Sequence, residues 1–239
     1  MQALSKQEVA QNVSTLQEQI RQAAAAAGRD PAQVRLMAVT KTVDPELVNA
    51  AIDAGITLLG ENKAQELCAK YDSYHKDGVE IHFIGHLQTN KVRQIVDKVQ
   101  MIESVDSLPL AEEINKRCAA LNKQMPILIE VNIGREESKS GVLPEDLPAL
   151  LEEISKLPAV SVRGLMAIPP VCENNEQVSQ YFYQIQQLFI DIKQKKYDNI
   201  NMEILSMGMS GDYQTAIAYG SNVVRIGTAM FGQRNYKRS

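Results

Sequence analysis

The sequence predicts a single (β/α)8 barrel with one extra helix at its amino terminus. Eight short apolar runs alternate with longer segments of helical periodicity, and none of these runs alternates apolar and polar residues as a half-exposed antiparallel strand would. The length of 239 residues is also close to the roughly 250 that is typical of such barrels. An open, doubly wound sheet is the competing fold, and it is disfavoured because no GxGxxG loop follows the first apolar run.

The helices have recognisable boundaries. Apolar residues over 9–27 recur at helical spacing until Gly28 ends the first helix. Asp44-Pro45 supplies an N-cap and a first helical residue, Pro144 opens a later helix, and residues 178–192 carry the strongest periodic pattern. The eight strands are expected at residues 34–39, 57–59, 81–84, 101–103, 126–131, 160–166, 202–206 and 222–226.

Composition excludes several classes of protein. The chain has 25 Lys and Arg against 29 Asp and Glu, a net charge of −4, which argues against a general nucleic-acid binder. Hydrophobic residues make up 44% and charged residues 23%, as in ordinary globular proteins. With no Trp and only four Phe, the core must be built mainly from aliphatic side chains and Met. No linker or repeat interrupts the sequence, so residues 1–239 are expected to form one domain.

Cysteine usage and hydropathy point to a cytoplasmic protein. The three cysteines, Cys68, Cys118 and Cys172, are odd in number and far apart, so no disulfide framework or CxxC metal site is indicated. The amino terminus lacks the apolar stretch of a signal peptide, and no apolar run is long enough for a transmembrane helix.

The active site of a (β/α)8 barrel lies at the carboxyl ends of its strands, and Lys41 follows the first of them. A lysine there would point into the mouth of the barrel, where a desolvated amine can act as a nucleophile. A solvated lysine at a strand exit is the structural alternative, and the lysine alone does not decide between them.

Arg225 is unusual because it lies inside the last strand. A period of two places Val223, Arg225 and Gly227 on one face of that strand. Either the arginine faces the lumen, or it forms a structural ion pair, for which Glu203 on the neighbouring strand is the candidate.

Gly227-Thr228 opens a final short helix and is expected to bind an anion, with Ser206 contributing a hydroxyl from the preceding strand. Plain helix capping is the structural alternative. Closure of the barrel makes the last strand the neighbour of the first, so this anion would lie within one cofactor length of Lys41. A ligand with a phosphate at one end and an aldehyde at the other, pyridoxal phosphate (PLP), fits that arrangement.

Two further signals do not indicate a site. His82 and His86 are four residues apart but span a strand and a loop, and no third ligand accompanies them, so they are expected to be core and rim residues rather than metal ligands. Neither a Ser-His-Asp order nor a GxSxG elbow is present.

Seven short motifs occur in a fixed order: VTKT around Lys41, GEN at 60–62, HFIGHLQTNK at 82–91, SKSG at 138–141, RGLMAI at 163–168, LSMGMSGD at 205–212 and VRIGTAMFG at 224–232. Together they resemble the pyridoxal phosphate homeostasis protein family, whose fold is that of the barrel domain of alanine racemase. The resemblance spans nearly the whole chain. Ile81, His86 and Lys63 depart from the family pattern at the rim.

The resemblance implies a role for seven residues. Lys41 would form an internal aldimine with PLP, Asn62 would line the cofactor, and Arg225 would face the pyridine nitrogen. The phosphate would be held by Ser206, the neighbouring backbone of Met207, and Gly227-Thr228.

Three functions follow from this reading, and a PLP carrier is favoured. An arginine beside the pyridine nitrogen disfavours its protonation and so weakens the cofactor as an electron sink. The sequence ends at Ser239, without the second domain that supplies a base in alanine racemase. The first alternative is a small PLP-dependent racemase or lyase, with Tyr219, His86 or Lys63 as the second base. The second alternative is a phosphosugar enzyme that uses the same phosphate site and no cofactor.

The partners follow from the carrier reading. We expect PLP as the ligand, PLP-dependent apoenzymes as recipients, no nucleic acid and no membrane, and a monomer or weak dimer. We expect no metal.

Overall fold

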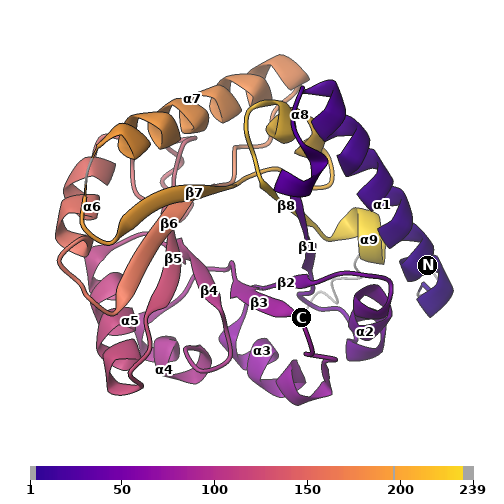
Figure 1. Cartoon of the computed structure of the whole chain (residues 1–239), viewed down its shortest axis with the longest axis horizontal. Helices are drawn as coiled ribbons and strands as arrows, with labels where there is room; N and C mark the ends of the chain where they lie inside the picture. Colours follow the sequence, from indigo (N-terminus) through magenta and orange to yellow (C-terminus); the bar gives the residue numbers. More distant parts are fainter. Residues whose placement is uncertain (1–3, 196, 234–239) are drawn as a thin grey trace.

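The computed structural model describes residues 4–195 and 197–233, and its eight strands form a closed parallel barrel (Figure 1). The strands are paired in sequence order, and β1 closes the barrel against β8 with Ala38 opposite Ile226. The strands are β1 (Arg35–Val39), β2 (Leu58–Glu61), β3 (Glu80–Phe83), β4 (Met101–Val105), β5 (Met125–Val131), β6 (Val160–Ala167), β7 (Ile200–Ser206) and β8 (Val223–Ile226). The predicted barrel is confirmed.

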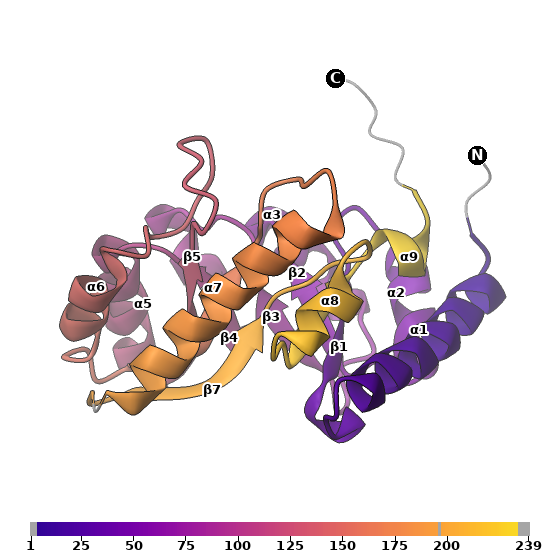
Figure 2. The same cartoon turned by 90° about the horizontal axis from the view of Figure 1, so that it is seen from above.

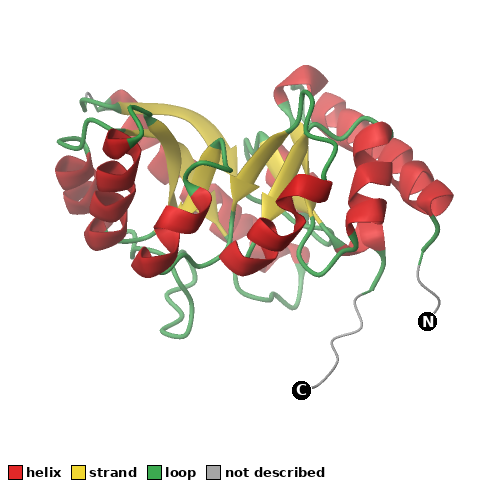
Figure 3. Ribbon diagram, turned by 90° about the horizontal axis from the view of Figure 1, so that it is seen from below, coloured by secondary structure: helices red, strands yellow, loops and turns green. Residues whose placement is uncertain are grey.

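Helices surround the strands on the outside of the barrel (Figure 3). The first helix packs against the α2, α8 and α9 side of the barrel, and α8 lies between it and α7 (Figure 2). The helices are α1 (Lys6–Ala26), α2 (Pro45–Asp53), α3 (Ala64–Lys70), α4 (Val92–Ile95), α5 (Leu108–Ala120), α6 (Leu147–Ile154), α7 (Asn175–Gln194), α8 (Tyr213–Ala218) and α9 (Thr228–Phe231).

The extra helix α1 has a defined start and one buried face. The Ser5 hydroxyl accepts a hydrogen bond from the Glu8 N–H at 3.2 Å, and the Glu8 carboxylate accepts one from the Ser5 N–H at 2.7 Å, which completes a capping box. The buried residues of α1 lie three or four positions apart, so one stripe of the helix faces the barrel. They are Val9, Val13, Leu16, Ile20 and Ala24.

The lumen has an apolar part and a polar part. One buried cluster joins β1, β2, β8 and the residue after β3, and a second joins β4, β5 and β6. The half-buried Ile204 of β7 packs against both. Their members are Met37, Val39, Leu58, Ile84 and Val223 in the first cluster, and Met101, Leu128 and Met166 in the second. The polar part is made of buried charged and hydroxyl side chains, which belong to the candidate site.

Most boundaries differ from the prediction by one or two residues, and β7 begins two residues earlier than expected, at Ile200. The helix expected to open at Pro144 begins at Leu147, with Pro148 in its first turn. The second strand runs to Glu61 and the fourth to Val105, beyond the ends expected at 59 and 103. Both strands continue through polar residues because those side chains are buried and hydrogen-bonded in the barrel wall.

Within the described residues, no helix is both long and apolar enough to cross a membrane.

Candidate functional site

Lys41 lies at the carboxyl end of β1, on the same side of the strand as Met37 and Val39, which line the lumen. Its side chain is half-buried and makes no hydrogen bond or ion pair with any described residue. The next residue, Thr42, has a φ of 61° and turns the chain away from the strand, and its N–H donates a hydrogen bond to the Glu66 carboxylate. The turn therefore leaves the Lys41 amine unpaired at the mouth of the barrel.

Strand register places two other predicted residues beside Lys41. Val39 pairs with Gly60, so continuing the register of β1 and β2 brings Asn62 opposite Lys41. Ala38 pairs with Ile226 on the other side, so Gly227-Thr228 leaves β8 next to the exit of β1. The structure therefore brings Lys41, Asn62 and Gly227-Thr228 to one edge of the barrel.

The Asn62 side chain carries a buried acceptor with no partner. Its Oδ1 atom makes no hydrogen bond to any described residue. Gly85, after β3, packs so closely that a Cβ atom there would lie 2.1 Å from the Asn62 carbonyl oxygen, so only glycine fits. A buried polar atom left without a partner costs about 1–3 kcal/mol, and a bound ligand would relieve this cost.

Arg225 faces the lumen and is 3% exposed. Its Nη1 donates to the Ser206 Oγ at 2.7 Å, and its Nη2 donates to the Ala167 carbonyl oxygen at 2.9 Å. The alternative of an ion pair with Glu203 is wrong, because Glu203 pairs with Arg163 on the neighbouring strand. Burial lowers the pKa of Arg225, and nearby carboxylates counteract this effect.

A chain of polar contacts crosses the lumen behind Arg225. The Ser206 Oγ donates to the Glu103 Oε2 at 2.6 Å, and the Glu103 Oε1 lies 2.7 Å from the His82 Nδ1. The His82 Nε2 lies 3.3 Å from Glu80, and Glu80 pairs with Arg35 at 3.1 Å. These side chains connect the amino end of the barrel to Arg225, and we call Glu103, His82, Ser206 and Arg225 the lumen network.

The charges of the lumen network support one another. Burial alone would favour neutral forms of both His82 and Glu103, but the hydrogen bonds of His82 to Glu103 and Glu80 raise the histidine pKa. His82 and Arg225 together lower the pKa of Glu103, although burial opposes this shift. Hydrogen bonding to His82 is the main reason that the pKa of Glu80 falls to about 2. The Glu103 carboxylate therefore lies between His82 and the Arg225 guanidinium, both of which favour its ionised form.

The residues predicted to hold the phosphate differ in whether they are buried and already hydrogen-bonded. The Ser206 hydroxyl is fully buried and committed to the lumen network, and the Met207 N–H donates to the Val223 carbonyl oxygen at 3.2 Å. Gly227 is buried at the start of α9, whereas Thr228 is exposed and its hydroxyl makes no hydrogen bond with a described residue. Among the side chains of this set, the Thr228 hydroxyl is free to meet an incoming ligand, and the phosphate role of the set stays a prediction.

The three candidates for a second base lie in different places. Tyr219 follows α8 and precedes β8, so it lies at the amino end of the barrel, away from Lys41. His86 is a rim residue whose side chain is 63% exposed and lies 3.2 Å from the Ser140 hydroxyl. Lys63 is exposed at the start of α3. His82 is a core residue, as predicted, and the described residues contain no cluster of metal-ligating side chains.

Sequence reasoning missed two carboxylates. Glu103 belongs to the lumen network, and Glu130 of β5 is 8% exposed at the carboxyl end of the barrel. An acidic residue inside an otherwise apolar strand was the available signal for both.

The fold and the unpaired lysine at the exit of β1 define a barrel of the alanine racemase class. Residues 11–235 match the family described as alanine racemase, N-terminal domain, and the chain belongs to this family. The pyridoxal phosphate homeostasis protein of Aquifex aeolicus is 44% identical over 226 residues, covering 95% of this chain and 98% of that protein. The protein of the same name from Pseudomonas aeruginosa is 42% identical over 229 residues, covering 95% and 96%.

A solved structure extends these comparisons. The structure of PipY from Synechococcus elongatus with PLP bound has a TM-score of 0.82 and 31% sequence identity. The match covers 94% of this chain and 100% of that one.

Proposed function

We propose that this protein binds PLP at the carboxyl end of its barrel and serves PLP homeostasis by buffering and delivering the cofactor. Residues 1–239 would act as one PLP-binding domain in the cytoplasm, as a monomer or weak dimer, with PLP-dependent apoenzymes as recipients. The observation that carries the proposal is the Lys41 amine, which is unpaired among the described residues and lies between Asn62 and Gly227-Thr228. The relatives named PLP homeostasis protein and the PLP-bound PipY structure support it.

The residues at this edge of the barrel fit PLP. A primary amine can bond covalently to the aldehyde of the cofactor. The buried Asn62 Oδ1 can accept a hydrogen bond from a ligand, and the Thr228 hydroxyl can donate one to a phosphate. A second domain is not needed for any of these contacts.

Arg225 would hold the pyridine side of the cofactor. Two hydrogen bonds fix the guanidinium, one to Ser206 of the lumen network and one to the Ala167 carbonyl oxygen, and Ser206 links it to the Glu103 carboxylate. PLP supplies an electron sink when its ring nitrogen is protonated. A guanidinium cannot accept a proton and disfavours a second positive charge beside it, so Arg225 would keep that nitrogen neutral. Weak turnover follows from this arrangement.

Binding is tested by titrating the purified protein with PLP and recording the absorption of the protein-bound cofactor after gel filtration. The wild-type protein should retain PLP with a band in the visible range. Lys41→Ala should lose that band and retain at least about a hundredfold less PLP, while the matched variant Lys63→Ala behaves as wild type. Equal retention by Lys41→Ala would contradict the proposal.

The enzyme alternative is tested separately. Incubation with alanine or serine in deuterated water, followed by mass spectrometry, measures exchange at the α-carbon. A carrier should give no exchange above the Lys41→Ala control. Rapid exchange that depends on Lys41 would favour the racemase or lyase.

A further inference from the structure

A cavity lies at the carboxyl end of the barrel, between the segments that follow β5 and β6. It has a volume of about 470 Å³, and Met209 from the segment after β7 completes its wall. None of the seven residues predicted to contact PLP lines it. We call it the Glu130 groove, after the carboxylate that it contains.

The rim of the Glu130 groove is apolar and exposed. Ile168 is 45% exposed, Met209 is 37% exposed, and Val171 is fully exposed. These three are half of the six large hydrophobic side chains that are exposed in the described residues, and all three line this one groove. Exposed apolar side chains that gather around a concave site mark a binding surface.

Glu130 supplies a polar group inside the groove. The residue as a whole is 8% exposed, and its carboxyl group makes no hydrogen bond or ion pair with any described residue. Its oxygens are not among the fully buried atoms that lack a partner, so they face the open groove. Burial, reinforced by Asp106, raises the pKa of Glu130 to about 7, although Arg225 opposes this shift. A buried carboxylate without a partner is costly, so a cationic donor in the groove would stabilise its charge.

We propose that the Glu130 groove binds a primary alkylamine, with the ammonium group on the Glu130 carboxylate and the apolar stem on Ile168, Val171 and Met209. An anion would meet the carboxylate unfavourably. A divalent cation would need further acidic or histidine ligands, and the described residues contain no such cluster. The proposal does not depend on PLP binding. An experiment can therefore contradict amine binding in the groove without contradicting PLP binding at Lys41, and the reverse also holds.

The groove lies next to the lumen network. The Arg225 Nη2 donates to the Ala167 carbonyl oxygen, and the following residue, Ile168, lines the groove. An amine bound there would therefore occupy the mouth of the barrel close to the residue predicted to face the cofactor ring.

The proposal predicts the direction in which amine affinity changes with pH. The charged groups around Glu130 are Arg225 from β8, Asp106 after β4, and Glu136 and Lys139 from the segment after β5. An ammonium group binds the ionised carboxylate, so amine affinity should rise with pH as Glu130 loses its proton. With a pKa of about 7, the ionised fraction rises roughly 30-fold from pH 5.5 to 8.5.

The test uses the full-length protein without PLP, and n-pentylamine as the probe. Methyl NMR signals of Ile168, Val171 and Met209 report binding, and the carboxyl carbon signal of Glu130 reports its protonation. We expect about 30-fold tighter binding at pH 8.5 than at pH 5.5, and a lower Glu130 pKa when the amine is present. The neutral probe n-pentanol should bind at least tenfold more weakly at pH 8.5.

Two variants control the test. Glu130→Gln should weaken n-pentylamine binding at least tenfold and abolish its pH dependence. Glu136→Gln, in the wall of the same groove, should bind within twofold of wild type. Equal binding of pentanol, no rise in affinity with pH, or full binding by a folded Glu130→Gln variant would each overturn the proposal. The wild-type pH series and the pentanol comparison decide the matter if Glu130→Gln does not fold.

Discussion

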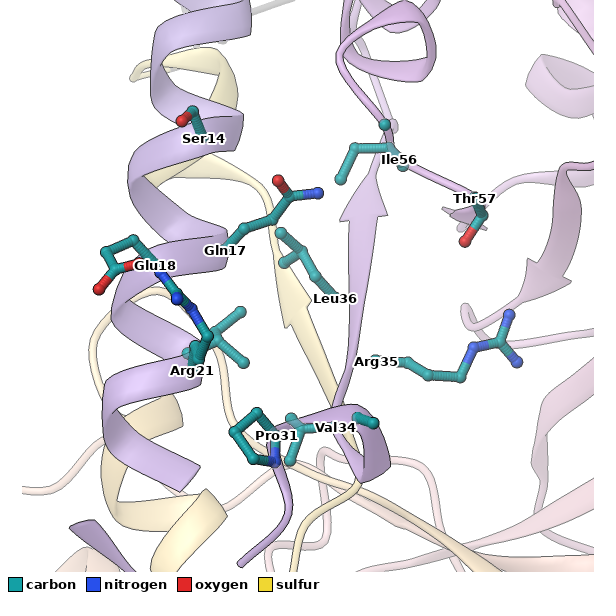
Figure 4. A pocket seen from close by; sticks show the side chains of 13 residues that line it. Ser14, Gln17, Glu18, Arg21, Pro31, Val34, Arg35, Leu36, Ile56 and Thr57 are labelled. Carbon is teal, nitrogen blue, oxygen red and sulfur yellow. Dashed lines mark ion pairs between the residues drawn. The ribbon is translucent and has the colours of Figure 1, made fainter. Parts of the chain in front are cut away.

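The two ends of the barrel differ in how their charges are satisfied. The amino end has a larger cavity, of about 660 Å³, between α1 and the starts of β1 and β2 (Figure 4). Its charged side chains are paired: Arg21 with Glu18 on α1, and Arg35 with Glu80. The carboxyl end instead presents the Lys41 amine, the Asn62 Oδ1 and the Glu130 carboxyl group, none of which has a partner among the described residues.

Cavity volume and unpaired polar groups therefore point to different ends of this barrel, and the proposed PLP site follows the unpaired groups. Two of the three buried side-chain atoms without a partner in the described residues, Glu61 Oε2 and Asn62 Oδ1, lie at the exit of β2. The third, Arg163 Nε, belongs to a guanidinium that already pairs with Glu203. Unpaired polar groups at the strand ends, rather than volume, indicate where a ligand binds.

The lumen network should produce the largest effect on stability. Glu103→Ala leaves Arg225 and His82 buried without their shared carboxylate. Removing one partner of a buried charged pair costs about 3–5 kcal/mol. Urea unfolding of the wild type and the variant measures this loss. The exposed pair at the amino end supplies the control, since Glu18→Ala should change the free energy of unfolding by less than about 0.5 kcal/mol. Similar changes in both variants would remove the contrast between the two regions.

Cofactor retention should separate the two predicted phosphate hydroxyls. Thr228→Val removes a hydroxyl that is free to donate to the phosphate, which is worth about 1.5–3 kcal/mol, or roughly 10- to 150-fold in the dissociation constant of PLP. Ser206→Ala should weaken PLP retention less, because the Ser206 hydroxyl already donates to Glu103 and its loss acts through the position of Arg225. Ser206→Ala should also lower the free energy of unfolding, because its hydroxyl joins Arg225 to Glu103. Thr228→Val should leave stability unchanged, since its side chain is exposed. Unaltered PLP dissociation in both variants would show that the phosphate lies elsewhere.

The lumen network should also make the free energy of unfolding depend on pH, with a smaller effect than that of Glu103→Ala. Interactions that raise the pKa of His82 stabilise the fold at pH values below about 6.5 and lose their effect as the pH rises through the folded-state pKa. The raised pKa of Glu130 acts with the same sign between about 4.5 and 7. We therefore expect the free energy of unfolding to fall as the pH rises from 5 to 8. Glu130→Gln removes the contribution of Glu130 to this pH dependence. In that background, His82→Gln should make the free energy of unfolding change less with pH between 5 and 8. The same pH dependence with and without His82→Gln would exclude His82 as its source.

The amino-end cavity should give the smallest effect on ligand binding. Arg21→Ala removes an exposed cation from its wall without touching the strand exits. PLP retention should stay within twofold of wild type, as measured by gel filtration and absorbance. A larger loss would mean that the amino end takes part in binding.

The order of strands and helices was predictable because a parallel barrel requires repeated apolar strands separated by amphipathic helices. Closure of the barrel predicted that Gly227-Thr228 lies beside Lys41, whereas the role of Asn62 came from the family resemblance. The partner of Arg225 was predicted wrongly, although strand parity argues against Glu203: Ile204 and Ser206 face the lumen from β7, so Glu203 faces outward.

The missed carboxylates have different causes. Glu103 gains its partners from β3, β7 and β8, and sequence spacing does not reveal contacts across a closed lumen. Glu130 lies on the lumen side of β5 with Leu128, as a regular alternation predicts, but the groove around it is formed by the segments after β5 and β6, which strand periodicity does not describe. Both errors concern tertiary partners rather than the position of the strands.

The most direct test of the account maps the lysine that holds PLP. The protein is saturated with PLP, reduced with borohydride and digested, and the pyridoxyl adduct is located by mass spectrometry. The account predicts that the adduct lies on Lys41 alone, because its amine is unpaired at the exit of β1 beside Asn62 and Gly227-Thr228. An adduct found mainly on Lys63 or Lys91 would contradict it.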